Sequence, residues 1–264
     1  HNPKEYNGYK VYGPDGAQLS PEATAVVVEK IKAVSDWFSV KTFEIRENTV
    51  NSLLSYIPAS LERKYYHNVI KQGVSRKAVK AEGKDIKIVY TSLHGTGYEP
   101  VTTVLSKMGI CVDVVPEQVE FDGNFSTVDV PNPEDKKALT MGIALAEKVK
   151  ADVVFGADPD CDRLGVAVRD DKGEFVGLSG NQVGVLLLDY VLSRLSQSNK
   201  LPDNAAVVKS FVSTNLAKAV CDGYGVDLYE TPVGFKFIGE KIKEAEESGK
   251  GTFVFGFEES CGYL

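Results

Sequence analysis

The sequence lacks the residue patterns of several common classes of protein. Its four cysteines lie far apart with no CxxC pair, which argues against a zinc ribbon and against a disulfide framework. No charged-then-apolar leader opens the chain, and no stretch approaches the roughly 20 apolar residues that span a bilayer. A net charge of -7 argues against general binding to nucleic acid or membrane surfaces, because both are polyanionic. We therefore expect a cytoplasmic protein that binds neither nucleic acid nor membrane.

The length and composition suit a folded protein of about two domains, since the 264 residues are 43% hydrophobic and 25% charged. Ser20 and Pro21 predict the start of a helix that continues to about Val34, and residues 60–80 are helical in pattern. Beyond residue 80, apolar strand-like segments alternate with helical ones. The expected strands are 85–90, 111–115, 152–155, 165–168, 206–208, 226–229 and 252–255, and the expected helices are 99–108, 133–150, 181–195, 215–221 and 235–247. This alternation predicts an α/β fold of mixed, mostly parallel sheets covered by helices on both faces.

An acidic loop follows the expected strand at 152–155. Asp158, Asp160 and Asp162 occupy alternate positions, so in an extended segment their side chains point the same way and can converge on one cation. Because all the ligands are oxygen and no His or second Cys lies in the loop, Mg²⁺ fits better than zinc. Three protein ligands leave octahedral positions for water or phosphate, which is typical of a phosphoryl-transfer centre.

Other kinds of acidic site require residues that can be compared with those of this loop. A calcium EF-hand needs Gly and Glu where this chain has Arg163 and Arg169, so that interpretation fails. A phosphatase of the aspartyl-phosphate type also uses Asp-x-Asp with Mg²⁺, but it predicts Thr or Val where this chain has Asp162. A solvated acidic turn remains open. Cys161 lies between two carboxylates that disfavour its thiolate, so we do not expect it to act as a nucleophile.

Two further loops carry groups suited to sugars and phosphates. The segment 256–262 offers Glu258 and Ser260, and a carboxylate with a hydroxyl suits sugar hydroxyl groups. The segment from Thr231 to Lys236 ends at the start of a helix, where its backbone amides and the lysine could hold phosphate. Taken alone, the segment 256–262 is equally compatible with an exposed acidic turn, and the segment 231–236 is better explained as a simple strand-to-helix turn. His94 lies in a Gly-rich turn without the ending of a P-loop, and packing is its expected role.

Taken together, these loops resemble those of the α-D-phosphohexomutase superfamily, which contains phosphoglucomutases and phosphomannomutases, and in particular its bacterial branch. The aspartate loop matches the metal loop of that family, the segment 256–262 its sugar-binding loop, and the segment 231–236 a further substrate-facing loop. The opening residues 1–10 are similar to the end of its catalytic loop, Thr-Ala-Ser-His-Asn-Pro followed by Asn-Gly-x-Lys. The resemblance covers nearly the whole chain. One departure is Cys161, at a position of the metal loop where the family more commonly has Gly or Ala.

The resemblance implies a role for each matching residue. Asp158, Asp160 and Asp162 would bind Mg²⁺. His1 and Arg163 would steady the phosphoserine loop, and Lys10 would act as general acid or base with a lowered pKa. The substrate-binding residues would be Thr231, Gly234, Lys236, Glu258 and Ser260.

The implied reaction interconverts hexose 1-phosphate and hexose 6-phosphate through a phosphoserine and a 1,6-bisphosphate, with glucose 1,6-bisphosphate as intermediate or activator. Residues 1–40 would then end a first domain, 41–80 form a helical connection, 81–198 a metal-binding domain and 199–264 part of a sugar-binding domain. The catalytic serine would precede His1, so we expect a fragment, incomplete at both ends, that does not turn over alone. A phosphopentomutase of the same family and a non-catalytic sugar-phosphate-binding module are the alternatives.

Overall fold

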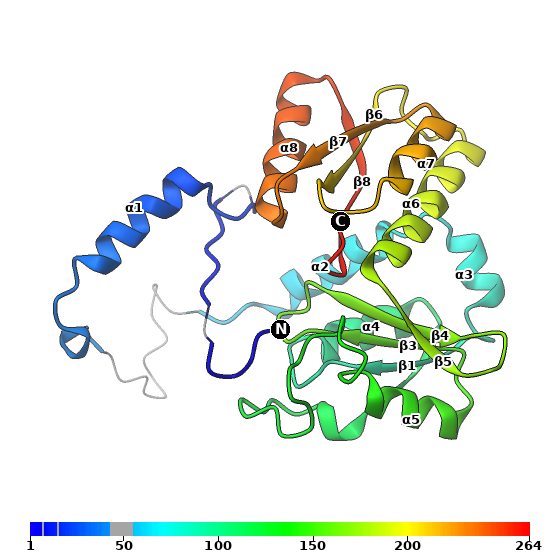
Figure 1. Ribbon diagram of the computed structural model, residues 1–264, viewed down its shortest axis with the longest axis horizontal. Coiled ribbons are helices and arrows are strands. Elements are labelled where there is room, and N and C mark those ends of the chain that lie inside the picture. Colours follow the sequence, from blue (N-terminus) through cyan, green and yellow to red (C-terminus); the bar gives the residue numbers. More distant parts are fainter. Residues whose placement is uncertain (7, 15, 43–54) are drawn as a thin grey trace.

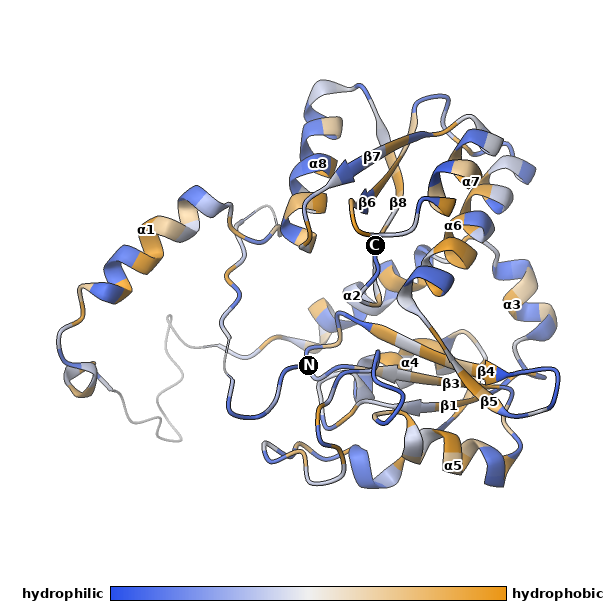
Figure 2. Ribbon diagram, viewed as in Figure 1, coloured by the Kyte–Doolittle hydropathy of each residue, from blue (hydrophilic) through white to orange (hydrophobic). Residues whose placement is uncertain are grey.

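The computed structural model describes residues 1–6, 8–14, 16–42 and 55–264, which form an N-terminal arm and two α/β units (Figure 1). Each unit has its own sheet and its own buried core, and the cores consist of apolar strand and helix residues. In Figure 2 the central strands are largely hydrophobic and the loops at their ends largely hydrophilic. The two units correspond to the α/β fold expected from the alternation of strands and helices.

The first sheet has the strand order β2-β1-β3-β4-β5. Strand β1 pairs in parallel with β2 and β3, whereas β4 is antiparallel to both β3 and β5. The sheet is therefore mixed, and its last two strands form a hairpin. The strands are β1 (Lys87–Thr91), β2 (Cys111–Val114), β3 (Val153–Ala157), β4 (Leu164–Arg169) and β5 (Phe175–Leu178).

Helices cover both faces of this sheet. On one face Val89, Val154 and Ala167 pack with Leu139 and Ala146, beside α5 (Thr140–Val149). Neighbouring strand residues point to the opposite face, where α4 (Tyr98–Lys107) packs against the sheet and α2 (Ala59–Lys71) packs against α4. The short helices α3 (Arg76–Glu82) and η2 (Pro116–Gln118) complete the unit. The α/β layers hold the loops at the strand ends in fixed positions.

The second sheet has the order β7-β6-β8-β9, with β6 parallel to β7 and β8, and β9 antiparallel to β8. Helices α6 and α7 pack on one face, and α8 packs against the other, as Figure 1 shows. The elements are β6 (Ala205–Ser210), β7 (Asp227–Thr231), β8 (Thr252–Glu258), β9 (Gly262–Tyr263), α6 (Gly180–Gln197), α7 (Leu216–Tyr224) and α8 (Phe235–Ser248).

Helix α6 packs with the second sheet, although the boundary expected at residue 199 would assign it to the first. Its residues Leu188 and Leu192 are fully buried in the same core as Val207 and Phe257. The helix starts with a capping box between Ser179 and Gln182, directly after β5. The polar linker that follows α6 thus lies inside the second unit, because the apolar stripe of α6 faces the second sheet.

The structure corrects two expected helices and adds two strands. The helical pattern at 60–80 is two helices, because Ser75 caps a new helix start after the turn at Gly73. The helix expected from Pro133 begins only at Thr140, since Asn132 and Asp135 accept hydrogen bonds from backbone amides two residues ahead and form turns. Two strands, β5 and the short β9, were missing from the prediction. The part of the expected connection at 43–54 lies outside the described residues.

The N-terminal arm carries α1 (Pro21–Lys32) and the short helix η1 (Trp37–Ser39). Ser20 accepts a hydrogen bond from the amide of Ala23, which confirms the predicted cap with Pro21 in the first turn. No residue of α1 is buried, and the helix projects away from both units in Figure 1. Among the described residues, none of the helices has the length and apolar character that crossing a membrane requires.

Candidate metal and sugar-phosphate site

The aspartate loop joins β3 to β4 at the carboxyl end of β3. Its backbone turns where the carbonyl of Asp158 accepts a hydrogen bond from the amide of Cys161 at 2.9 Å, and Cys161 has a φ of +60°. The Oδ1 atom of Asp158 accepts hydrogen bonds from the amides of Asp162 at 3.1 Å and of Arg163 at 3.0 Å. The Asp158 side chain thereby orders the loop from within.

The structure brings the three aspartates together as the sequence predicts. One carboxylate oxygen from each of Asp158, Asp160 and Asp162 lies within 4.8 Å of the other two. Asp158 is fully buried, and its Oδ2 atom has no hydrogen-bond partner. Burial, followed by the charges of Asp162 and Asp160, raises the pKa of Asp158 to about 7. A buried carboxylate oxygen that accepts no hydrogen bond and lies beside two other carboxylates fits a hard divalent cation, which would offset both the burial and the repulsion.

Lys10 reaches this loop from the N-terminal arm. Its Nζ atom lies 2.7 Å from Asp160 Oδ2 and 2.7 Å from Asp162 Oδ2. Burial lowers the pKa of Lys10, but the hydrogen bonds to the two carboxylates and the charges of those carboxylates together raise it by more, so the pKa lies above its usual value. The expected lowering of the Lys10 pKa is therefore wrong, because its neighbours in the structure are anions and not cations.

His1 and Arg163 lie together beside the buried aspartate. The Arg163 guanidinium donates to His1 Nε2 at 3.2 Å, which places the imidazole proton on Nδ1, and that atom lies 3.7 Å from Asp158 Oδ2. Arg163 also lies 3.9 Å from Asp158 Oδ2 and 4.0 Å from Glu134 Oε2. His1 and the end of the aspartate loop thus form one charged cluster.

The two expected sugar-binding loops meet at the carboxyl edge of the second sheet. Glu258, at the end of β8, is buried and accepts a hydrogen bond from the amide of Gly234 at 2.5 Å. Burial raises the pKa of Glu258, and the Gly234 hydrogen bond opposes that rise. Thr231 is buried at the end of β7, Lys236 lies in the first turn of α8, and Ser260 is half-buried in the turn between β8 and β9.

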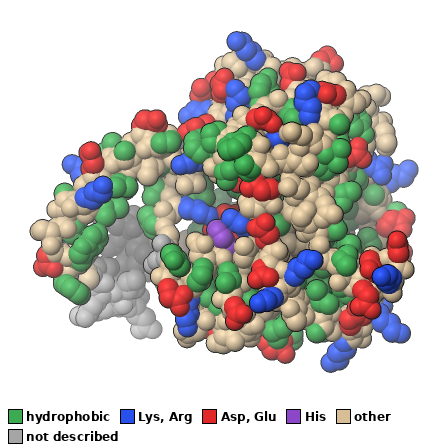
Figure 3. Space-filling model, viewed as in Figure 1, with side chains coloured by type: hydrophobic (Ala, Val, Ile, Leu, Met, Phe, Trp, Pro, Cys, Tyr) green, Lys and Arg blue, Asp and Glu red, His purple; other side chains and the backbone are tan. Residues whose placement is uncertain are grey.

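The aspartate loop and the turn that follows β8 are joined through the backbone. The amide of Leu164, directly after the aspartate loop, donates to the carbonyl of Cys261 at 2.9 Å. On the face seen in Figure 3, basic, acidic and histidine side chains gather at the middle of the molecule, between the two units. The site therefore lies where the carboxyl edge of the first sheet meets the turn that follows β8.

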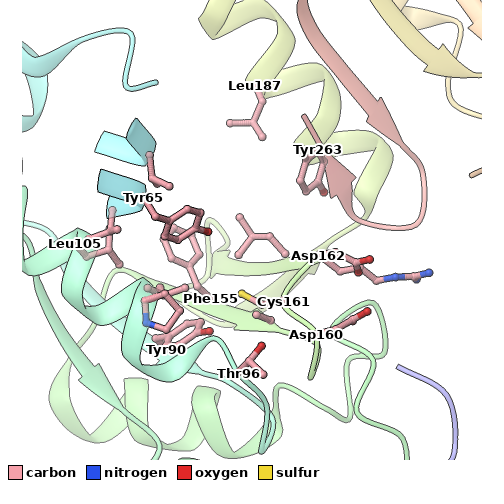
Figure 4. Close-up of a pocket in the computed structure, with 17 residues that line it drawn as sticks. Tyr65, Tyr90, Thr96, Leu105, Phe155, Asp160, Cys161, Asp162, Leu187 and Tyr263 are labelled. Atoms are coloured by element: carbon pink, nitrogen blue, oxygen red, sulfur yellow. The ribbon is translucent and has the colours of Figure 1, made fainter. Parts of the chain in front are cut away.

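A cavity of about 630 Å³ lies beneath the aspartate loop, between α2, α4 and α6. Asp160, Asp162 and Arg163 line its polar side, and aromatic and aliphatic side chains line the remainder (Figure 4). The hydroxyl of Tyr90 is buried there without a hydrogen-bond partner. The lining includes no residue from 231–236 or 258–260, so this cavity is distinct from the place where the two sugar-binding loops meet.

Sequence reasoning missed several residues that the structure places at this site. Glu134 pairs with Arg163, and Glu259 accepts hydrogen bonds from two serines of the strand β6 and its turn. Nothing in the local sequence links Glu134 to a residue almost thirty positions away. The sequence does contain a signal for the residues near β6, because the charged Lys209 follows four apolar residues in a strand that is buried along its whole length.

Comparisons with known proteins identify the family of this chain. Models of the phosphoglucomutase/phosphomannomutase family match in chain order: α/β/α domain I at residues 1–36, domain II at 63–173 and domain III at 179–264. A phosphoglucomutase from Staphylococcus epidermidis is 39% identical over the whole of this chain, and one from Staphylococcus aureus is 37% identical. The chain spans 46% of the length of each relative.

A solved structure shares the fold. The putative phosphomannomutase from Thermus thermophilus matches 76% of this chain and 42% of its own, with a TM-score of 0.58 and 26% identity. The fold and the carboxylate triad define an α/β protein with a candidate centre for a divalent cation. With the three domain matches in order and the relatives above, the chain belongs to the α-D-phosphohexomutase superfamily.

Proposed function

We propose that this chain carries the metal-binding and sugar-binding parts of a phosphohexomutase, together with the end of its catalytic loop. The whole protein would interconvert hexose 1-phosphate and hexose 6-phosphate through a phosphoserine and a 1,6-bisphosphate intermediate. The observation that carries this proposal is the buried Oδ2 atom of Asp158, which accepts no hydrogen bond and lies in a triad of carboxylates. The order of the three family domains along the chain supports it.

Each part of the site has a role in this proposal. Asp158, Asp160 and Asp162 hold Mg²⁺, which neutralises charge on a phosphoryl group when it is bound. Arg163 and His1 orient and stabilise anionic oxygens beside the metal loop, and Glu134 fixes the guanidinium. Lys10 is the candidate to move a proton at the accepting hydroxyl group of the sugar once its ammonium is released from the two aspartates.

The second unit recognises the sugar phosphate. Glu258 and Ser260 bind sugar hydroxyls, because a carboxylate accepts from two vicinal hydroxyls while a serine both donates and accepts. Thr231 ends β7, and the Gly234 backbone and Lys236 lie at the start of α8, where a helix N-terminus and an ammonium favour a phosphate. The four cysteines are all free thiols, which fits the cytoplasmic location expected from the sequence.

A binding experiment on this chain tests the proposal. In calorimetry with Mg²⁺ present, we expect the chain to bind glucose 1-phosphate, and Glu258→Gln to weaken that binding about tenfold, because charge-assisted hydrogen bonds to the sugar are lost. Glu247→Gln, an exposed glutamate on α8, is the matched control and should bind as the unaltered chain does. Mannose 1-phosphate and ribose 1-phosphate measured in parallel rank the sugar preference. No binding of any of the three would overturn the proposal.

A further inference from the structure

A lysine is completely buried in the second sheet. Lys209 lies on the central strand β6 and has 0% of its side chain exposed. Its ammonium donates to three acceptors: the Ser210 carbonyl at 3.3 Å, the Ser213 carbonyl at 3.0 Å and Glu230 Oε1 at 2.7 Å. Every N–H of the ammonium therefore has a partner, as a buried charge requires.

The hydrogen bonds from Lys209 fix the turn that follows β6. Because one ammonium binds the carbonyls of Ser210 and Ser213, it holds the two ends of this short segment together. The hydroxyl oxygens of Ser210 and Ser213 lie 2.7 Å apart, and both hydroxyls contact Glu259 Oε2, at 2.7 Å and 3.1 Å. One carboxylate oxygen of the turn between β8 and β9 is thus held by two hydroxyl groups.

This polar cluster of Lys209, Ser210, Ser213 and Glu259 contacts both loops assigned to the sugar. Glu259 stands between Glu258 and Ser260. At the other loop, the hydroxyl of Thr231 donates to the carbonyl of Lys209 at 3.4 Å, and the carbonyl of Thr231 accepts from the Phe211 amide at 2.9 Å.

We propose that the polar cluster positions the two sugar-binding loops relative to each other, and that Glu259 and Ser213 are positioning residues for sugar-phosphate recognition. The inference rests on the proposed function, because it concerns how the site for the sugar is set. Glu259 directs its carboxylate to the hydroxyls of the two serines, which fixes the backbone that carries Glu258 and Ser260.

The energetics of burial support a positioning role. Removing an ammonium from water is costly, and replacing a buried ion together with its charged partner by apolar side chains is often neutral or stabilising. A buried ion with directional hydrogen bonds instead specifies one arrangement of the groups around it. Here those groups are the ends of β6 and β7 and the turn after β6.

The test compares removal of the Glu259 carboxylate with its conservative replacement. In calorimetry with glucose 1,6-bisphosphate and Mg²⁺, Glu259→Ala is expected to weaken sugar binding at least about tenfold. Glu259→Gln is expected to stay within about threefold of the unaltered chain, because its amide oxygen accepts the same two hydroxyl hydrogen bonds. Ser213→Ala is a milder second variant with the same expected direction, in case Glu259→Ala does not fold. Glu246→Ala, on α8 and exposed, is the matched control.

Binding of Mg²⁺ provides the readout that separates positioning from general damage. The aspartate loop lies in the first unit, so Glu259→Ala and Ser213→Ala should bind Mg²⁺ as the unaltered chain does. Unchanged sugar binding in a folded Glu259→Ala or Ser213→Ala variant would overturn the inference alone. Equal weakening by Glu259→Ala and Glu259→Gln would also overturn it, because the charge and not the position would then matter. Failure of the unaltered chain to bind the bisphosphate would overturn the proposed function and this inference with it.

Discussion

At the scale of single residues, the charge balance of the aspartate loop determines its chemistry. Asp158 is buried with one oxygen that accepts no hydrogen bond, whereas Asp160 and Asp162 are more accessible and both pair with Lys10. Burial raises the pKa of Asp160, but hydrogen bonds with Lys10 and Asp158, together with the charge of Lys10, lower it by more. The pKa of Asp160 therefore lies below its usual value. Lys10 and a divalent cation therefore compete for the same two carboxylates.

Removal of the Lys10 ammonium should strengthen the binding of Mg²⁺. Each partly exposed ion pair contributes about 0.5 kcal/mol, so loss of both in Lys10→Met removes about 1 kcal/mol of competition and tightens Mg²⁺ binding about fivefold. Calorimetric titration of the variant measures this change, with Lys4→Met, an exposed lysine of the same arm, as the control. Weaker Mg²⁺ binding in Lys10→Met would show that the ammonium supports the metal site and does not compete with it.

At the scale of secondary structure, α6 connects the two units through its N-terminus and packs in only one of them. Its buried leucines contact the core of the second sheet, while Leu186 on the same helix is 61% exposed. The side of α6 that faces the core follows from helical periodicity, because residues three or four apart share a face. The stability of the second unit should therefore depend on that face.

Truncation of a buried leucine in α6 should destabilise the second unit. Leu188→Ala removes a side chain with 0% exposure, and such changes cost about 2–5 kcal/mol. Leu186→Ala is the control, because Leu186 is an exposed leucine of the same helix, two positions away. It should change the free energy of unfolding by less than about 0.5 kcal/mol. Urea unfolding followed by circular dichroism compares the two variants. Similar losses for both would mean that α6 does not pack as described.

The elements show what could be predicted from this sequence. The strands that end in the aspartate loop and in Glu258 were predictable, because each is a short apolar run followed by polar residues. The three metal-loop carboxylates were predictable from their spacing alone. The packing of α6 against the second sheet could not be predicted, because an apolar stripe on a helix does not specify which sheet covers it. The Leu164–Cys261 and Glu259–Ser213 contacts could not be predicted either, since they join residues 97 and 46 positions apart.

At the scale of the whole molecule, two α/β units place different chemistry at a common edge. The first contributes the three carboxylates of the proposed cation site, and the second contributes the carboxylate, hydroxyl and helix N-terminus of the proposed sugar-phosphate site. The backbone hydrogen bond between Leu164 and Cys261 joins the two loops. Residues His1 and Lys10 of the N-terminal arm complete the charged cluster.

The central claim is that Asp158, Asp160 and Asp162 form a site for Mg²⁺, and calorimetric titration of the chain with Mg²⁺ tests it most directly. The unaltered chain and Asp171→Asn, which removes an exposed carboxylate from the turn between β4 and β5, should bind Mg²⁺ equally. Asp160→Asn, which removes a ligand charge, should bind it at least about tenfold more weakly. Equal Mg²⁺ binding by the chain and by Asp160→Asn, or no binding by either, would contradict the account.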